Sequence, residues 1–175
     1  MNESRRWESI PDRREPLTKD MVEYIIDKGK ELSKTNPDNI YLSLSDWLVL
    51  GLQAGFRRME WAQDRAHLKK YKDIQRNIDG SPAVFILKDF ELRKKGNKMI
   101  DNSSNKEVSK ASITNLKWRF QKNMDNGQTI SYIEDNKNKK LCFVRASKRI
   151  RNRALKLKIP QDQASAVFIE LKKTN

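Results

Sequence analysis

Apolar residues recur every three or four positions near the start of the chain, with polar residues between them. The first such stretch contains Met21, Ile25, Ile26 and Leu32. Thr18 precedes the stretch and Pro37 follows it, and residues of these types commonly mark the two ends of a helix. The pattern predicts a helix over residues 18–34.

A second stretch with helical spacing follows. Its apolar positions are Leu44, Trp47, Leu48 and Leu52. Ser43 with Asp46 three residues later fits the capping box of a helix N-terminus, and Gly55 suits a helix C-terminus because glycine tolerates positive φ. The pattern therefore predicts a second helix between Ser43 and Gly55. A third helical stretch is expected to begin near Arg57 and to continue towards residues 69–72.

Strand-like segments begin after Gly80. Residues 83–90 (AVFILKDF) are a short run of β-branched and aromatic residues, which predicts a strand rather than a helix. In residues 111–122 apolar side chains alternate with polar ones, as they do in a half-buried strand. The alternating apolar residues are Leu116, Trp118 and Phe120. Asn126–Gly127 predicts a two-residue turn, because both central residues of a type I′ turn need positive φ, and residues 129–133 are expected to return as the partner strand.

These elements predict an α+β fold with three helices, a small three-stranded antiparallel sheet, a further basic helix and a final apolar stretch over residues 166–171. Residues 94–110 are rich in Lys, Asn and Ser, and we expect them to form a flexible loop. Residues 1–16 are polar and are expected to form a tail or linker, so that residues 17–175 make up the folded unit. The expected core contains Trp47, Leu48, Leu52, Ile86, Leu116, Trp118 and Phe120.

The chain is strongly basic, with 37 Lys and Arg against 23 Asp and Glu and a net charge of +14 over 175 residues. No acidic residue occurs from Asn136 to Gln161, and this window contains ten Lys or Arg. A buried stripe at near-helical spacing is formed there by Ala146, Ile150, Ala154 and Leu157. A basic stripe on another face is formed by Arg149, Arg153 and Lys156. The window therefore predicts a helix with one buried face and one basic face.

A basic surface of this kind can bind nucleic acid, lie on an anionic membrane or remain solvated without a partner. A membrane-surface helix needs large apolar side chains, whereas two of the four residues in the buried stripe are alanine. Nucleic acid is therefore the better expected partner, with a solvated basic face that has no partner as the alternative; the family resemblance given below implies double-stranded DNA. The longest apolar run, residues 47–52, is far too short to cross a bilayer. The N-terminal residues lack the apolar segment of a signal peptide, so we expect an intracellular location with DNA, in a nucleus or a nucleoid.

Metal and disulfide chemistry are not expected in this chain. Cys142 is its one cysteine and His67 its one histidine. A disulfide needs two cysteines and a structural zinc site needs four ligands, mostly Cys and His, so neither can be assembled from these two residues.

A G-x-R-x-x-E pattern, formed by Gly55, Arg57 and Glu60, lies within residues 51–63 (GLQAGFRRMEWAQ). This segment resembles the tyrosine recombinases of the phage-integrase family, in which such a motif begins a helix. The family continues from that helix into a three-stranded sheet whose second turn carries a catalytic lysine, and then into another helix. The chain has the same predicted order of elements, and Lys122 in FQKNMDNGQTI matches the lysine.

The helix after the predicted sheet is also similar to integrase-like sequences, especially those of eukaryotic mobile elements. It lies in residues 141–159, LCFVRASKRIRNRALKLKI. The resemblance covers about residues 17–170. It implies a mainly helical catalytic domain with a small sheet, which breaks and rejoins DNA strands in integration or recombination and needs neither a metal nor a nucleotide cofactor.

The resemblance also implies roles for individual residues. Arg57 takes the place of the first catalytic arginine, whose guanidinium stabilises charge on the phosphate oxygens, and Glu60 that of its acidic companion. Lys122 takes the place of the general acid that protonates the departing 5′ oxygen. With a two-residue turn, Lys122 is expected to lie opposite Ser131. The residues expected to contact DNA are Arg58, Arg119, Lys148, Arg149, Arg153 and Lys156.

The sequence also departs from the family pattern. A complete member has a His-x-x-Arg box, a further His or Trp and a nucleophilic Tyr after the sheet, whereas His67 precedes the predicted sheet and Tyr132 lies within it. We therefore expect a catalytic domain that is incomplete at its C-terminus, binds DNA and does not cut it alone. Homo-oligomers on DNA are expected only of a full-length form. The alternatives are a non-catalytic basic nucleic-acid-binding module and a basic structural protein without a nucleic-acid partner.

Overall fold

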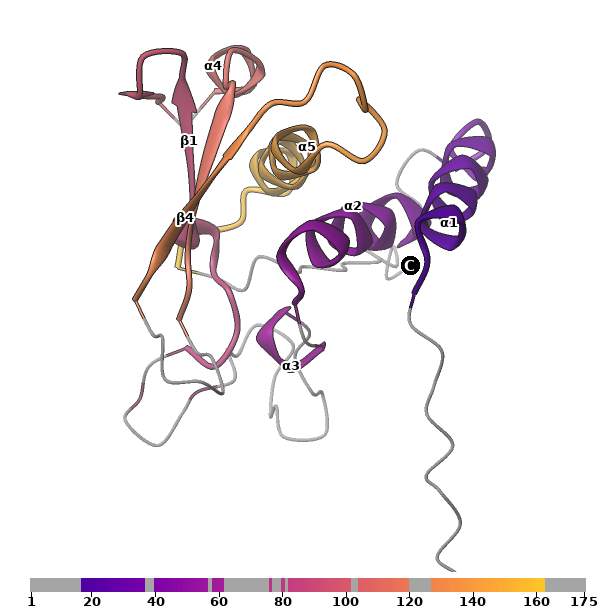
Figure 1. Cartoon of the computed structure of the whole chain (residues 1–175), viewed down its shortest axis with the longest axis horizontal. Helices are drawn as coiled ribbons and strands as arrows, with labels where there is room; N and C mark the ends of the chain where they lie inside the picture. Colours follow the sequence, from indigo (N-terminus) through magenta and orange to yellow (C-terminus); the bar gives the residue numbers. More distant parts are fainter. Residues whose placement is uncertain are drawn as a thin grey trace, which may run out of the picture.

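The computed structural model (Figure 1) describes residues 17–36, 40–56, 58–61, 76, 80, 82–101, 104–119 and 127–162, without the side chains of Arg58 and Met59. The order of elements is α1 (Lys19–Leu32), α2 (Ile40–Ala54), α3 (Arg58–Trp61), a 3-10 turn η3 (Leu87–Asp89), β1 (Phe90–Lys94), β2 (Lys98–Met99), α4 (Asn105–Ser109), β3 (Ile113–Lys117), β4 (Thr129–Ile133) and α5 (Phe143–Lys156). The predicted α+β class is confirmed. The expected tail over residues 1–16 and the apolar stretch over residues 166–171 lie outside the described residues.

The helix predicted over residues 18–34 is confirmed as α1. Thr18 is its N-cap, and its hydroxyl oxygen accepts a hydrogen bond from the backbone N–H of Met21 at 3.3 Å. Val22 and Ile26 are buried on the inner face. Gly29 permits close contact with α2, because a Cβ at this position would lie 3.3 Å from the backbone of Tyr41.

The second predicted helix is confirmed as α2, but its expected start at Ser43 is wrong. The helix begins at Ile40, so Ser43 and Asp46 lie inside it and are buried instead of forming a capping box. Gly55 ends the helix with a φ of +73°, as expected. Leu52 is 36% exposed and is not part of the core, contrary to the prediction. Of the third predicted helix, the structure describes the short α3 alone.

The predicted strand over residues 83–90 is displaced in the structure. Val84, Phe85 and Ile86 are buried in irregular backbone that leads into η3, and the strand begins only at Phe90. The backbone N–H of Phe85 donates to the carbonyl oxygen of Glu60, and that of Ile86 donates to a carboxylate oxygen of Asp89, each at 2.8 Å. These two acceptors satisfy the backbone N–H groups of Phe85 and Ile86 without a neighbouring strand.

The sheet has four antiparallel strands in the order β2-β1-β3-β4, one more than predicted. The additional strand, β2, and the helix α4 both fall within residues 94–110, so the prediction of a flexible loop there is wrong. Figure 1 shows α4 beside the β1–β2 hairpin at one end of the sheet.

The predicted pairing of residues 111–122 with 129–133 is confirmed for β3 and β4, but the expected register is wrong. Asn115 lies opposite Ser131, and the Ser131 hydroxyl donates to the Asn115 side-chain oxygen at 2.8 Å. Trp118 is level with Gln128, whose carbonyl oxygen accepts its backbone N–H. The connection is therefore longer than the expected two-residue turn, and Lys122 does not lie opposite Ser131.

Helix α5 covers one face of the sheet and also packs against α2 (Figure 1). The prediction of a buried stripe is confirmed for Ala146, Ile150 and Ala154, whereas Leu157 caps the helix and is half-buried. Aromatic rings fill the space between α2, the sheet and α5: Trp47, Phe56, Phe85, Phe90, Trp118 and Phe143. Of the remaining predicted core residues, Ile86 and Leu116 are buried, Leu48 is half-buried against the core and Phe120 lies outside the described residues.

Candidate nucleic-acid interface

The junction between α2 and α3 carries the G-x-R-x-x-E pattern. Gly55 turns the chain at the end of α2, and Phe56 then inserts its ring into the core, 4.9 Å from the ring centroid of Phe85 and 5.3 Å from that of Trp118. Arg57 lies outside the described residues, and the side chain of Arg58 is not described. This packing holds Phe56, the residue before Arg57, in the core.

The end of β3 lies against the same junction. Trp118 is 4% exposed and contacts Phe56 and Phe85. Lys122 lies outside the described residues, in the connection that leaves Arg119 and returns at Gly127. The backbone N–H of Gly127 donates to the carbonyl oxygen of Trp118 at 2.8 Å, which closes the base of this connection. Among the described residues, Phe56, which precedes Arg57 in the sequence, thus contacts Trp118, which precedes Lys122 by four residues.

Glu60 is positioned at the same end of the molecule. It is 8% exposed on α3, and its backbone carbonyl oxygen is bonded to the irregular segment before η3. The neighbouring Trp61 stacks on Trp47 with ring centroids 5.4 Å apart and an interplanar angle of 7°. The structure therefore shows Glu60 as a buried residue of α3, and its companion role stays a prediction.

Arg119 is held by a buried acid. Its Nε donates to Oδ2 of Asp89 at 2.6 Å, and the Asp89 side chain is 1% exposed. Burial raises the pKa of the Asp89 carboxyl, while the hydrogen bonds from Arg119 and the backbone N–H of Ile86 act in the opposite direction. Arg119, which was expected to contact DNA, is therefore engaged in an ion pair with Asp89 next to Trp118.

Two of the predicted DNA-binding arginines on α5 point towards α2. Arg149 Nε donates to Oδ1 of Asp46 at 2.6 Å, and Arg153 Nη2 donates to Oδ2 at 3.0 Å. Asp46 is 1% exposed, and burial raises the pKa of its carboxyl although both guanidinium groups lower it. The spacing of four residues that predicted a solvated basic stripe instead places two cations around one buried carboxylate.

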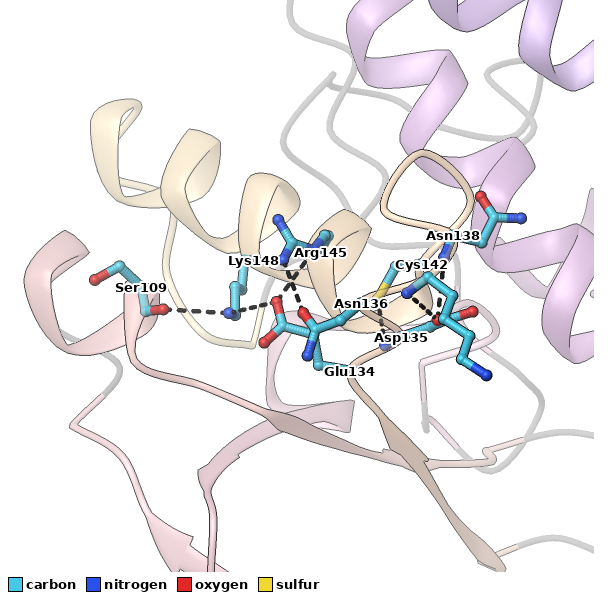
Figure 2. A network of polar contacts seen from close by, with 9 residues as sticks. Ser109, Glu134, Asp135, Asn136, Asn138, Cys142, Arg145 and Lys148 are labelled. Atoms are coloured by element: carbon cyan, nitrogen blue, oxygen red, sulfur yellow. Dashed lines mark hydrogen bonds and ion pairs between the residues drawn. The ribbon is translucent and has the colours of Figure 1, made fainter.

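Lys148 belongs to a polar network between α5, α4 and the end of β4 (Figure 2). Its Nζ donates to the backbone carbonyl oxygen of Ser109 and to Oε1 of Glu134, each at 3.2 Å. Arg145 also pairs with Glu134 at 3.2 Å. Lys156, in contrast, is exposed in the last turn of α5.

Arg151 is a buried cation that the sequence patterns did not single out. It is 2% exposed, and its Nη2 donates to the carbonyl oxygens of Leu87 at 2.6 Å and Phe90 at 3.2 Å, while Nη1 donates to Gln161. Burial lowers the pKa of its guanidinium to about 10. Its neighbour Ile150 marks the buried face of the helix, which is the one local signal that could have indicated an inward arginine.

The arrangement offers cations and a protected carboxyl group rather than a metal centre. Among the residues that the structure describes, no cluster of His, Cys, Asp or Glu could hold a metal ion. Within the same ranges, no helix is long and apolar enough to span a membrane.

Comparisons of the chain with protein-family models, with curated proteins and with solved structures gave no match.

Proposed function

We propose that the chain is a duplex-DNA-binding domain of tyrosine-recombinase type, in which Arg57 and Lys122 contact one backbone phosphate. The contact between Phe56 and Trp118, with ring centroids 5.3 Å apart, is the observation that carries this proposal. Arg57 directly follows Phe56, and Lys122 follows Trp118 by four residues. Four residues span at most about 14 Å. The proposal therefore takes the two cations to act together near the Phe56–Trp118 contact.

The residue types suit the chemistry of phosphoryl transfer. An arginine guanidinium can donate to two phosphate oxygens at once and stays charged at all relevant pH values. An ammonium group can give up a proton to a departing oxygen. In the proposed site Arg57 binds the phosphate and Lys122 protonates the departing 5′ oxygen. Buried Glu60 lies in α3, three residues after Arg57. Strand transfer additionally needs a nucleophile, which in the proposed reaction a second polypeptide supplies.

Binding to duplex DNA is expected to depend steeply on salt. Each phosphate neutralised by Lys or Arg releases counterions and contributes about −0.9 to the slope of log affinity against log salt. With three or more phosphates contacted, we expect a slope of about −2.7 or steeper. Fluorescence anisotropy with a labelled duplex, across salt concentrations from roughly 50 to 200 mM, measures this slope. Affinity that stays constant over this range would refute DNA binding through phosphates.

A double-mutant cycle at Arg57 and Lys122 separates the recombinase-type site from a general basic surface. If both side chains contact one phosphate, Arg57→Ala and Lys122→Ala each weaken binding, and the double variant loses less than the product of the two single losses. Lys34→Ala is the matched control, because Lys34 is an exposed lysine just after α1. Independent losses that simply multiply favour the alternative, a non-catalytic nucleic-acid-binding module.

The ion pairs of the basic side chains of α5 bear on the alternative of a non-catalytic nucleic-acid-binding module. A non-catalytic module was expected to use the basic helix and the hairpin. On the helix, Arg149 and Arg153 are engaged with Asp46, and Lys148 with Glu134. These ion pairs use part of the hydrogen-bonding capacity of the three side chains, while the Arg149 and Arg153 side chains stay 45% and 26% exposed. The end of the sheet near Trp118 is therefore the better candidate for the interface.

We expect no covalent protein–DNA adduct from the 175-residue chain. Its tyrosines are Tyr24, Tyr41, Tyr71 and Tyr132. The Tyr132 ring stacks on Phe143 with centroids 3.7 Å apart, and burial raises the pKa of its phenol, so attack by its phenolate is disfavoured. Tyr24 and Tyr41 are exposed on α1 and α2, and Tyr71 lies outside the described residues. A suicide-substrate cleavage assay tests this expectation.

Recovery of an adduct mapped to any of the four tyrosines would place the active site elsewhere. Activity that appears when a second polypeptide with a His-x-x-Arg box and a tyrosine is added, and disappears with Arg57→Ala, would support the proposed site. Lys34→Ala serves again as the control for nonspecific loss of charge.

A further inference from the structure

The described parts of residues 94–110, which are residues 94–101 and 104–110, form a lysine-rich projection with β2 and α4 at the end of the sheet. Gly96 and Asn97 have φ values of 81° and 62°, which allow the tight turn between β1 and β2. The Asn97 backbone N–H donates to the carbonyl oxygen of Lys94 at 3.0 Å. Ser104 caps α4 through a hydrogen bond from the backbone N–H of Glu107 at 3.2 Å. We call this segment the lysine platform.

The lysine platform is fixed to the rest of the fold by its own small apolar core. The side chains of this core are Leu92, Ile100, Val108 and Ala111, with Leu155 of α5 packed against them. Val108 is fully buried at 0% exposure. The hydrogen bond from Lys148 to the carbonyl oxygen of Ser109 adds a polar tie to α5 (Figure 2). The described parts of the platform are therefore packed against the sheet and α5.

The charge on the platform is strongly unbalanced. It carries five lysines against Asp101 and Glu107. The lysines are Lys94, Lys95, Lys98, Lys106 and Lys110. Glu107 binds Lys94 at 2.9 Å and also Lys110, and these contacts lower the pKa of its carboxyl to about 2. Glu107 is thus charged near neutral pH, but its charge is already used within the platform.

The remaining lysines have no such compensation. Lys95, Lys98 and Lys106 are exposed and have no ion pair in the part of the chain that the structure describes. Lys98 lies directly opposite Lys94 across the β1–β2 ladder. Like charges at directly opposed strand positions destabilise a sheet. A polyanionic partner would neutralise this repulsion.

We infer that the lysine platform is a second phosphate-contacting surface, which binds the backbone of the same DNA duplex away from the Arg57–Lys122 site. The inference rests on the proposed function. The platform lies at the opposite end of β3 from Trp118, and the six residue steps from Ser112 to Trp118 span about 20 Å. Successive phosphates of one strand are about 3.4 Å apart along the duplex axis, so this span corresponds to about six base pairs.

Duplex DNA suits the platform better than an anionic membrane does. A membrane-surface element needs large exposed apolar side chains as well as cations. Among the described residues of the platform, Met99 is the one exposed large apolar side chain, because Ile100 and Val108 are buried. A surface with several lysines and little apolar area matches the phosphate backbone.

The inference is tested with two triple variants that remove the same charge. The platform variant is Lys95→Gln, Lys98→Gln and Lys106→Gln. The control is Lys19→Gln, Lys30→Gln and Lys34→Gln, which changes three exposed lysines on or just after α1. The platform variant should reduce the magnitude of the salt slope by about 2 to 3 and weaken duplex binding at least tenfold, whereas the control should change the slope by less than about 1. A third variant, with arginine at the three platform positions, should bind like the original chain.

The possible outcomes are distinguishable. If the original chain shows no salt-dependent duplex binding, the proposed function fails and the inference fails with it. If the original chain binds steeply but the two glutamine variants bind equally, the platform is not a contact and the proposed function stands. Loss of binding to phosphatidylserine vesicles in the platform variant, with DNA binding unchanged, would assign the platform to a membrane and overturn the inference. Circular dichroism of every variant confirms that the fold is kept.

Discussion

Replacement of Trp118 by alanine is expected to lower the free energy of unfolding by about 3 to 5 kcal/mol. The side chain is 4% exposed and lies at the centre of the aromatic core, with ring centroids 5.3 Å from Phe56 and 5.4 Å from Phe85. Its removal loses apolar burial and leaves a cavity that the rigid rings of its neighbours fill only in part. Chemical denaturation, with the slope against denaturant compared between variants, measures the loss.

Leu52→Ala is the matched control for Trp118→Ala. Leu52 was expected in the core from its helical spacing, but it is 36% exposed. Its replacement should therefore cost less than about 1 kcal/mol. Equal losses for the two variants, or a loss under about 1 kcal/mol for Trp118→Ala, would mean that the packing at the end of β3 differs from the structure described above.

The positions of α1 and α5 could be predicted because their sequence patterns are local. Thr18 caps the helix that its sequence position indicated, and Ala146, Ile150 and Ala154 lie on one face because a helix places residues four apart side by side. The pairing of β3 with β4 was also found from alternation, since Leu116 points to the core and its neighbours do not. Each of these patterns depends on residues close in sequence.

The sheet as a whole could not be predicted from such patterns. A short apolar run reads equally well as a strand or as a buried irregular segment. Residues 83–89 take the second form because the carbonyl oxygen of Glu60 and the carboxylate of Asp89 satisfy the backbone of Phe85 and Ile86. The polar composition of residues 94–110 predicted a loop. Two apolar side chains within this range, Ile100 and Val108, are buried in a small apolar cluster beside β2 and α4.

For the candidate site, the sequence supplied the residue types and their order, and the structure adds a contact between the segments that carry them. The G-x-R-x-x-E pattern contains no information on what lies beside Phe56. Trp118 is distant in sequence, and only the folded chain brings its ring to 5.3 Å from that of Phe56. The roles of Arg57 and Lys122 remain a proposal that this contact supports.

Charge patterns are the least informative when the partner residue is far away in the chain. Asp46 is 103 residues from Arg149 and 107 from Arg153. Locally, Ser43 and Asp46 match a capping box, and Arg149 and Arg153 match a solvated basic stripe. The start of α2 at Ile40 moves Asp46 into the helix interior and turns it towards α5. The residues of both patterns therefore form one structure, an ion-pair cluster around the buried Asp46 carboxylate.

The double replacement Arg149→Met and Arg153→Met is expected to cost about 3 to 5 kcal/mol at neutral pH, because it leaves the Asp46 carboxylate buried without a counter-charge. Asp46→Asn is the informative control and should cost less than about 1.5 kcal/mol. Burial already raises the pKa of Asp46, which means that its charged form is disfavoured in the fold, and both arginines can extend to solvent since their side chains are 45% and 26% exposed.

The pH dependence of the double variant follows from the same burial. Without the two guanidinium groups, nothing on α5 opposes the desolvation that raises the pKa of Asp46 above its unfolded value of about 3.9. Below the unfolded pKa, Asp46 is protonated in both states and its penalty is absent. The penalty grows as pH rises from the unfolded pKa to the higher folded pKa and is complete above the folded pKa. The stability deficit of the double variant should therefore be larger at about pH 7 than at about pH 4. Denaturant midpoints at the two pH values measure this difference. A deficit that grows on acidification would show that Asp46 is solvated.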